Sequence, residues 1–255
     1  MLNIQSLKRI VFCATCLLMS QPVTAEQQSH LGFSNQYIQL KTSYDQPFTV
    51  YVAGPENAKQ GILLIHGWWG LNQEMEEWAN KYSAIGYRVM AIDLYNQQVT
   101  TNPVRARALM DGVKQSDAND KYAAAIKSLS APGRKLAVAG RSFGANQALY
   151  AASVAPENVS AIVVYYPFEK VMTDIKILKP IKAPILGHFA RHDRYFTPDM
   201  LAQFTGAIKT SGLTMKVDMY DAQHAFTNPT GKNFNISAFK LSQQRTNEFL
   251  LKYLN

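Results

Sequence analysis

The sequence predicts a doubly wound α/β fold built on a mostly parallel sheet. Short apolar runs of strand length alternate with segments of helix length along most of the chain, a pattern typical of repeated strand–helix–strand units. Most of these runs lack polar alternation, as expected for strands that helices cover on both faces. Near the N-terminus, by contrast, polar and apolar residues alternate, which indicates an antiparallel edge.

The predicted strands follow in chain order. Residues 37–40 and 48–52 form the antiparallel pair, and the segment between them holds Asp45 and Pro47, which favour a turn. The parallel strands are predicted from apolar runs at 61–66, 87–92, 135–139, 161–165 and 184–189, with a further strand-like run at 214–220.

Helix-length segments separate these runs. In residues 72–85, Met75, Trp78 and Tyr82 recur at helical spacing, and Gly86 follows as a helix stop. Further helices are predicted at 120–129, 145–153, 198–210 and 239–254. The polar stretch 95–103 has no clear period, and we expect it to be a loop beside the functional site.

Residues 1–25 differ from the rest of the chain. Lys8 and Arg9 precede the apolar stretch 10–19, and small residues lead up to Ala25. About ten apolar residues are too few to span a hydrocarbon core of roughly 30 Å. The pattern predicts a secretory signal peptide cleaved after Ala25, a periplasmic or secreted protein, and no stable membrane anchor.

Composition narrows the class of protein. Both cysteines, Cys13 and Cys16, lie in the predicted signal peptide, so residues 26–255 can form neither a disulfide nor a cysteine nucleophile. The segment 26–255 is long enough to form one α/β domain with a sizeable core. The formal net charge is +8, but no basic run with interleaved aromatic residues appears, so we expect a solvated basic surface and no nucleic-acid partner.

The pentad at residues 140–144 carries the strongest chemical signal. It reads G-x-S-x-G, follows the strand predicted at 135–139 and precedes the helix predicted at 145–153. This is the context of a nucleophile elbow, in which a tight turn exposes a serine at a helix N-terminus. Glycines flank the serine because such a turn leaves no room for Cβ atoms. We therefore predict Ser142 as a nucleophile.

A serine hydroxyl needs a base and an orienting acid. Asp193 follows the strand predicted at 184–189, and His224 follows the strand predicted at 214–220, so both are expected at the carboxyl edge of the sheet beside Ser142. The order Ser, Asp, His is that of α/β-hydrolases. Three other carboxylates remain alternatives for the acid: Asp199, Asp218 and Asp221.

An oxyanion hole requires two backbone donors. The N–H of Phe143, directly after the nucleophile, is the first candidate, and the N–H of Trp68 in the segment 66–70 is the second. The alternative for this segment is a glycine-rich turn with two packed tryptophans.

With these residues in view, the chain resembles the dienelactone hydrolase family from about residue 48 to residue 254. The H-x-W-W-G pattern at 66–70 and the D-L-Y pattern at 93–95 are more specific than the pentad, and Asp193 and His224 stand in the family's order. The resemblance implies a compact single-domain α/β-hydrolase without a large lid, acting without metal or organic cofactor.

The chain departs from the family's pattern at several positions. Ser142 stands where the family has a cysteine, and Gly67 stands where it has the glutamate that activates that thiol. Gln97 and Asn228 occupy the positions of two arginines that grip a substrate carboxylate. Arg141 either replaces that clamp or lies beneath the turn in a salt bridge. We expect neutral substrates to be preferred over carboxylated ones.

Together these features predict an exported serine hydrolase that cleaves a small-molecule ester, thioester or lactone through an acyl-enzyme. Trp69, Tyr166 and Arg141 are the predicted pocket residues. Two alternatives stay open: an acyltransferase that uses the same triad, and an envelope binding module built on a degenerate hydrolase fold.

Overall fold

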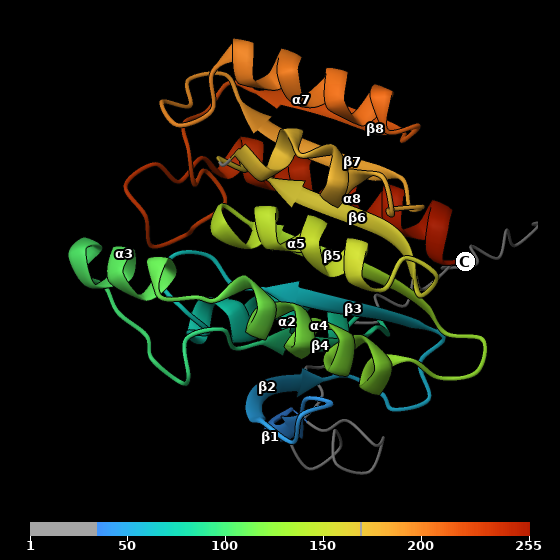
Figure 1. Cartoon of the computed structure of the whole chain (residues 1–255). Coiled ribbons are helices and arrows are strands. Elements are labelled where there is room, and N and C mark those ends of the chain that lie inside the picture. Colours follow the sequence, from blue (N-terminus) through green and yellow to red (C-terminus); the bar gives the residue numbers. More distant parts are fainter. Residues whose placement is uncertain (1–34, 169) are drawn as a thin grey trace, which may run out of the picture.

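The computed structural model describes residues 35–168 and 170–255, so the predicted signal peptide lies outside the described residues. One eight-stranded sheet runs through the domain in the order β1-β2-β4-β3-β5-β6-β7-β8 (Figure 1). β1 pairs with β2 and β2 with β4 in antiparallel fashion, and all other neighbours are parallel. The strands are β1 (Gln36–Lys41), β2 (Pro47–Ala53), β3 (Gln60–Ile65), β4 (Arg88–Ile92), β5 (Lys135–Arg141), β6 (Val159–Tyr165), β7 (Ile185–Ala190) and β8 (Met215–Tyr220).

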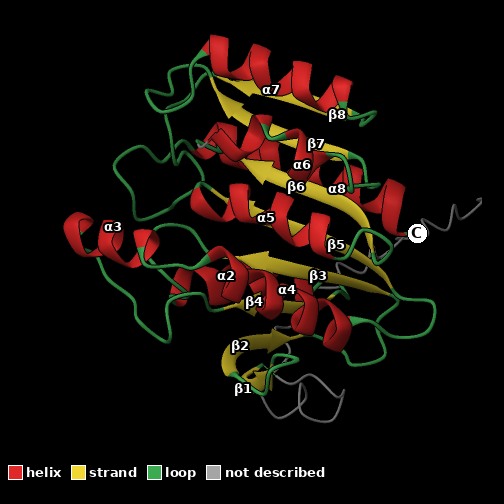
Figure 2. Ribbon diagram, in the orientation of Figure 1, coloured by secondary structure: helices red, strands yellow, loops and turns green. Residues whose placement is uncertain are grey.

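Helices cover both faces of this sheet, as Figure 2 shows. The helices are α2 (Gln73–Ser83), α3 (Pro103–Asp111), α4 (Gln115–Leu129), α5 (Phe143–Val154), α6 (Ile175–Leu178), α7 (Pro198–Thr210) and α8 (Ile236–Leu254), with a 3₁₀ turn at Lys170–Thr173. α2 and α8 pack on one face, while α4, α5, α6 and α7 pack on the other. The mostly parallel sheet with an antiparallel N-terminal edge confirms the predicted fold class.

Strand β3 shows why two cores form. Its apolar side chains point alternately to opposite faces. Ile62 and Leu64 join the core under α2 and α8, whereas Leu63 and Ile65 join the core under α4 and α5. All four are almost completely buried, so this central strand reads as a continuous apolar run in the sequence.

A helix that the sequence did not predict follows the loop after β4. Residues 95–102 form neither helix nor strand, as expected for this stretch. Pro103 then opens α3, and the Asn102 side chain accepts hydrogen bonds from the backbone N–H groups of Val104 and Arg105. An asparagine N-cap followed by proline at the first helical position is a start signal. α3 projects beyond the carboxyl ends of the strands (Figure 2).

α4 and α8 begin at least three residues earlier than predicted. α4 starts at Gln115 rather than at residue 120, because polar residues fill its first turn and no apolar period marks them. α8 starts at Ile236 because the Asn235 side chain caps it, accepting from the N–H of Ala238 at 3.0 Å. Among the described residues, no helix combines the length and the apolar character needed to cross a membrane.

Candidate active site

A strained turn at the end of β5 presents Ser142. Its backbone has φ 54° and ψ −118°, a conformation that non-glycine residues rarely adopt. A Cβ on Gly140 would overlap the carbonyl of Gly144, and one on Gly144 would overlap the carbonyl of Ile65. The two glycines of the pentad are therefore required by close backbone approach, as the sequence predicted. Ser142 lies at the N-cap of α5 with its hydroxyl at the sheet's carboxyl edge.

Ser142, His224 and Asp193 form a chain of hydrogen bonds. Ser142 Oγ lies 3.0 Å from His224 Nε2, and His224 Nδ1 lies 2.7 Å from Asp193 Oδ2. Asp193 Oδ1 accepts a further hydrogen bond from the N–H of Tyr195 at 2.8 Å. The Asp193 side chain is 1% exposed, whereas that of His224 is 13% exposed. The buried carboxylate can therefore orient the imidazole, whose other nitrogen faces the serine.

A side-chain hydrogen bond and an aromatic contact hold the loop that carries His224 in place. Ala225 adopts φ 64°, and Asn233 Nδ2 donates a hydrogen bond to the carbonyl of His224 at 2.9 Å. Tyr166, which has φ 39°, places its ring edge against the imidazole at a centroid distance of 4.9 Å. Ser142, Tyr166 and Ala225 all line the same pocket. Strained backbone gathered at one site is typical of functional centres.

The alternative acids have other partners. Asp218 lies between Arg245 and Lys216, at 3.4 Å and 3.5 Å. Asp221 pairs with His192 at 2.7 Å on the surface. Asp199 lies in the first turn of α7, where a negative charge favours the helix N-terminus. Asp193 is the carboxylate that contacts His224.

A buried histidine fixes the loop that was predicted to carry the second oxyanion donor. His66 Nδ1 lies 2.8 Å from the carbonyl of Gly67, and His66 Nε2 accepts from the N–H of Leu94 at 3.1 Å. Both bonds fit one neutral tautomer with the proton on Nδ1. Burial lowers the pKa of His66 below its usual value, which favours this neutral form. His66 therefore ties the loop after β3 to the loop after β4.

The two candidate oxyanion donors lie on neighbouring segments. α5 begins at Phe143, so the N–H of this residue belongs to the first helical turn and has no acceptor within the helix. The loop of Trp68 approaches the elbow closely, since a Cβ on Gly67 would lie 3.3 Å from the carbonyl oxygen of Arg141. The residue after the serine and the residue after Gly67 thus flank the same turn.

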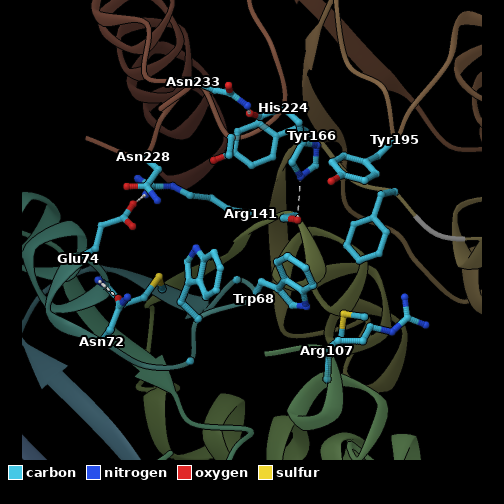
Figure 3. A pocket seen from close by; sticks show the side chains of 18 of the residues that line it. Trp68, Asn72, Glu74, Arg107, Arg141, Tyr166, Tyr195, His224, Asn228 and Asn233 are labelled. Atoms are coloured by element: carbon cyan, nitrogen blue, oxygen red, sulfur yellow. Dashed lines mark hydrogen bonds and ion pairs between the residues drawn. The ribbon is translucent and has the colours of Figure 1, made fainter. Parts of the chain in front are cut away.

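A cavity of about 340 Å³ opens beside Ser142 and His224 (Figure 3). The three predicted pocket residues, Trp69, Tyr166 and Arg141, all line it. The lining residues that sequence reasoning did not anticipate include Glu74, Arg107, Met110 and Asn233. The Asn102–Pro103 helix start could have placed Arg107 and Met110 at this edge.

Arg141 lies in a salt bridge at the base of the pocket, the second of the two roles expected for it. Its Nη1 lies 2.5 Å from Glu74 Oε1, and its guanidinium stacks 3.9 Å above the ring of Trp78. The Arg141 side chain is only 8% exposed. Burial raises the pKa of Glu74, while the guanidinium of Arg141 acts in the opposite direction. Of the positions that lack clamp arginines, Asn228 lines the pocket and Gln97 is exposed outside it.

Potential metal ligands do not gather in the described part of the chain: residues 35–168 and 170–255 contain no group of three or more histidine, cysteine, aspartate or glutamate side chains suited to hold an ion.

Comparisons with known proteins agree with this architecture. The profile of the Dienelactone hydrolase family matches residues 48–254. A protein of Aquifex aeolicus named "Putative carboxymethylenebutenolidase" is 28% identical over 189 residues, which cover 70% of this chain and 81% of that protein. Protein usf of Aquifex pyrophilus is 27% identical over 191 residues, with the same shares covered.

The fold is shared with solved structures. The dienelactone hydrolase-like promiscuous phosphotriesterase P91, from metagenomic libraries, superposes with a TM-score of 0.75 at 15% sequence identity, over 86% of this chain and 99% of that one. The family profile spans most of the chain, and the sheet order, the elbow and the pocket are consistent with it. The chain therefore belongs to the dienelactone hydrolase family, and it is a hydrolase that acts on small-molecule esters.

Proposed function

We propose that this hydrolase cleaves an ester, thioester or lactone through an acyl-enzyme on Ser142. The observation that carries the proposal is the hydrogen-bonded chain from Ser142 Oγ through His224 to Asp193, with distances of 3.0 Å and 2.7 Å. These distances are within the range in which an imidazole can take a proton from a serine hydroxyl.

In the proposed acylation step, Ser142 Oγ attacks the substrate carbonyl carbon while His224 Nε2 takes the hydroxyl proton. Asp193 holds the ring so that Nδ1 carries its proton toward the carboxylate and Nε2 is free to act as the base. When the tetrahedral intermediate collapses, His224 returns the proton to the leaving oxygen or sulfur. Water then attacks the acyl-enzyme while His224 takes its proton. The bond between the acyl carbon and Ser142 Oγ breaks as His224 returns the proton to Oγ, which releases the carboxylic acid.

The tetrahedral intermediate places a negative charge on the former carbonyl oxygen. We assign the backbone N–H groups of Phe143 and Trp68 as its donors, because the first opens α5 and the loop of the second approaches the elbow. Loss of one such donor typically costs 100- to 1,000-fold in turnover, roughly 2.7–4 kcal/mol of transition-state stabilisation.

A fluorophosphonate probe tests the nucleophile. We expect one adduct per chain, at Ser142, and we expect Ser142→Ala to lose both labelling and ester turnover while its melting temperature stays close to that of the parent protein. Ser116→Ala, an exposed serine in the first turn of α4, is the matched control and should label normally. Undiminished labelling of Ser142→Ala would refute the assignment.

Acyl transfer is the second candidate, since an alcohol can replace water in the deacylation step. Product analysis in the presence of a short alcohol distinguishes the two reactions: free acid alone indicates hydrolysis, whereas a new ester indicates transfer.

We further propose that the protein is exported to the periplasm or the medium without a stable membrane anchor, on the strength of the signal-peptide pattern at residues 1–25. N-terminal sequencing of the exported protein should begin at Glu26. A start at Met1 in that fraction would refute cleavage.

A further inference from the structure

The ion pair in the pocket wall has a consequence for substrate charge. We infer that Glu74 is a specificity-determining residue: by neutralising Arg141, it makes the pocket accept an uncharged ester and disfavour one that carries a carboxylate. The inference rests on the proposed ester hydrolysis at Ser142 and adds the substrate class.

Arg141 is a buried cation beside the reacting centre. It directly precedes Ser142, its side chain is 8% exposed, and its guanidinium carbon lies over the Trp78 ring, 3.9 Å from the ring centroid. A guanidinium placed this way would bind a substrate carboxylate strongly, because charge-assisted hydrogen bonds gain strength away from water. Position alone would therefore make Arg141 an anion clamp.

Glu74 already occupies the place beside the Arg141 guanidinium that a substrate carboxylate would take. It lies in the first turn of α2, where a carboxylate is favoured by the helix N-terminus, and its Oε1 lies 2.5 Å from Arg141 Nη1. A substrate carboxylate brought to Arg141 would face this second negative charge at short range. Like charges in a poorly solvated site repel strongly.

The other charged side chains of the pocket do not replace the clamp. Arg107 pairs with Asp111 at 2.7 Å, and its side chain is 64% exposed. Arg194 is exposed and contacts Tyr195. Charges in contact with water are screened and contribute little to binding. Figure 3 shows Arg107 at the opposite side of the pocket from the Glu74–Arg141 pair.

The remaining polar lining near the pair is uncharged. Asn72, Asn228 and Asn233 line the same cavity, and amide side chains both donate and accept hydrogen bonds. This end of the pocket therefore suits a neutral polar group, such as a carbonyl, ether or hydroxyl, in the part of the substrate that does not react.

Two esters with the same six-carbon acyl chain test the inference: 4-nitrophenyl hexanoate, which ends in a methyl group, and mono-4-nitrophenyl adipate, which ends in a carboxylate. The measured quantity is the ratio of kcat/KM for adipate to that for hexanoate. We expect Glu74→Gln to raise this ratio by roughly 10- to 100-fold, because one charge-assisted hydrogen bond becomes available to the substrate. Glu74→Gln/Arg141→Gln should return the ratio to near the parent value.

Glu77→Gln is the matched control, because Glu77 lies on the same helix with its side chain exposed and should leave the ratio unchanged. Glu74→Met removes the same charge. It replaces Glu74→Gln in the measurement of the kcat/KM ratio if Glu74→Gln has a much lower melting temperature than the parent protein. An unchanged ratio in the folded variants, with hexanoate turnover intact, would overturn the inference and leave the proposed function standing. Absence of both hexanoate turnover and Ser142 labelling in the parent protein would overturn both.

Discussion

Two histidine–aspartate pairs of equal length lie near the carboxyl end of β7. His224 contacts Asp193 at 2.7 Å, and His192 contacts Asp221 at 2.7 Å. The side chains of the first pair are 13% and 1% exposed, whereas those of the second are 60% and 87% exposed. The two pairs have the same nitrogen–oxygen distance, but they differ in how far their side chains are exposed to solvent. The first pair is also joined to a serine, 3.0 Å from the imidazole.

Burial is the property that makes such a pair useful for orienting an imidazole. A buried carboxylate keeps its hydrogen bond to one imidazole nitrogen, since no water competes for it. An exposed pair exchanges its partner for water at little cost in free energy. The two pairs interleave in the sequence, since His192 precedes Asp193 and Asp221 precedes His224.

The largest expected effect is on the base. His224→Ala should lower kcat for a 4-nitrophenyl ester by about four orders of magnitude, because Ser142 then lacks a proton acceptor. His192→Ala, its surface counterpart, should change kcat by less than twofold. The kcat of both variants is measured at saturating substrate, and a melting curve of each variant shows whether it is folded. A comparable loss in both variants would show that the exposed pair takes part in the reaction.

The second largest effect is expected from replacing the carboxylate that contacts His224. Asp193→Asn should lower kcat by two to four orders of magnitude, because an amide in place of the carboxylate no longer enforces the tautomer that the reaction needs. Asp221→Asn is the matched change on the surface and should be nearly neutral. Asp218→Asn provides the remaining comparison, since Asp218 pairs with Arg245; a greater loss there than at Asp193 would reassign the acid.

A third histidine, His188, is buried with hydroxyl partners in place of a carboxylate. His188 hydrogen-bonds Tyr220 and Thr246 at 2.8 Å each, and burial lowers its pKa to about 3. An unfolded histidine binds its proton near pH 6.5, so between about pH 6.5 and 3 the unfolded chain holds the extra proton. The free energy of unfolding should therefore fall as the pH falls through this range, by at most about 1.4 kcal/mol per pH unit from this residue.

His188→Gln tests this linkage. Denaturant unfolding of the variant at pH 6, 5 and 4 should show a shallower pH dependence than the parent protein. His66, whose pKa is also lowered by burial, contributes in the same direction and remains in the variant. Identical slopes in the two proteins would contradict the assignment of a neutral buried His188.

Much of this arrangement was readable from the sequence. Apolar runs predicted the parallel strands from β3 to β7, and an alternating run predicted β8. The pentad with its two glycines predicted the turn at Ser142, because backbone crowding there admits no Cβ. Asp193 and His224 follow strands whose carboxyl ends share one edge, so their meeting followed from topology.

The contacts across the pocket could not be read in the same way. Glu74 reaches Arg141 from a helix 67 positions away in the chain, and its spacing on α2 does not distinguish it from Glu77. The sequence did not predict α3 because the helix is polar on average. Its buried residues are Ala106 and Met110, which are too few to show a helical period. Side-chain pairing between elements depends on tertiary packing, which local periodicity does not encode.

The smallest expected effect concerns the exposed pair itself. A double-mutant cycle of His192→Ala and Asp221→Ala should give a coupling free energy of about 0.5 kcal/mol or less, because water and salt screen two side chains that are mostly exposed. Urea unfolding at low and at high salt measures the coupling, and added salt should reduce it further. A salt-insensitive coupling above about 1.5 kcal/mol would mean that the pair is held as rigidly as His224 and Asp193, and burial would then no longer account for the difference between them.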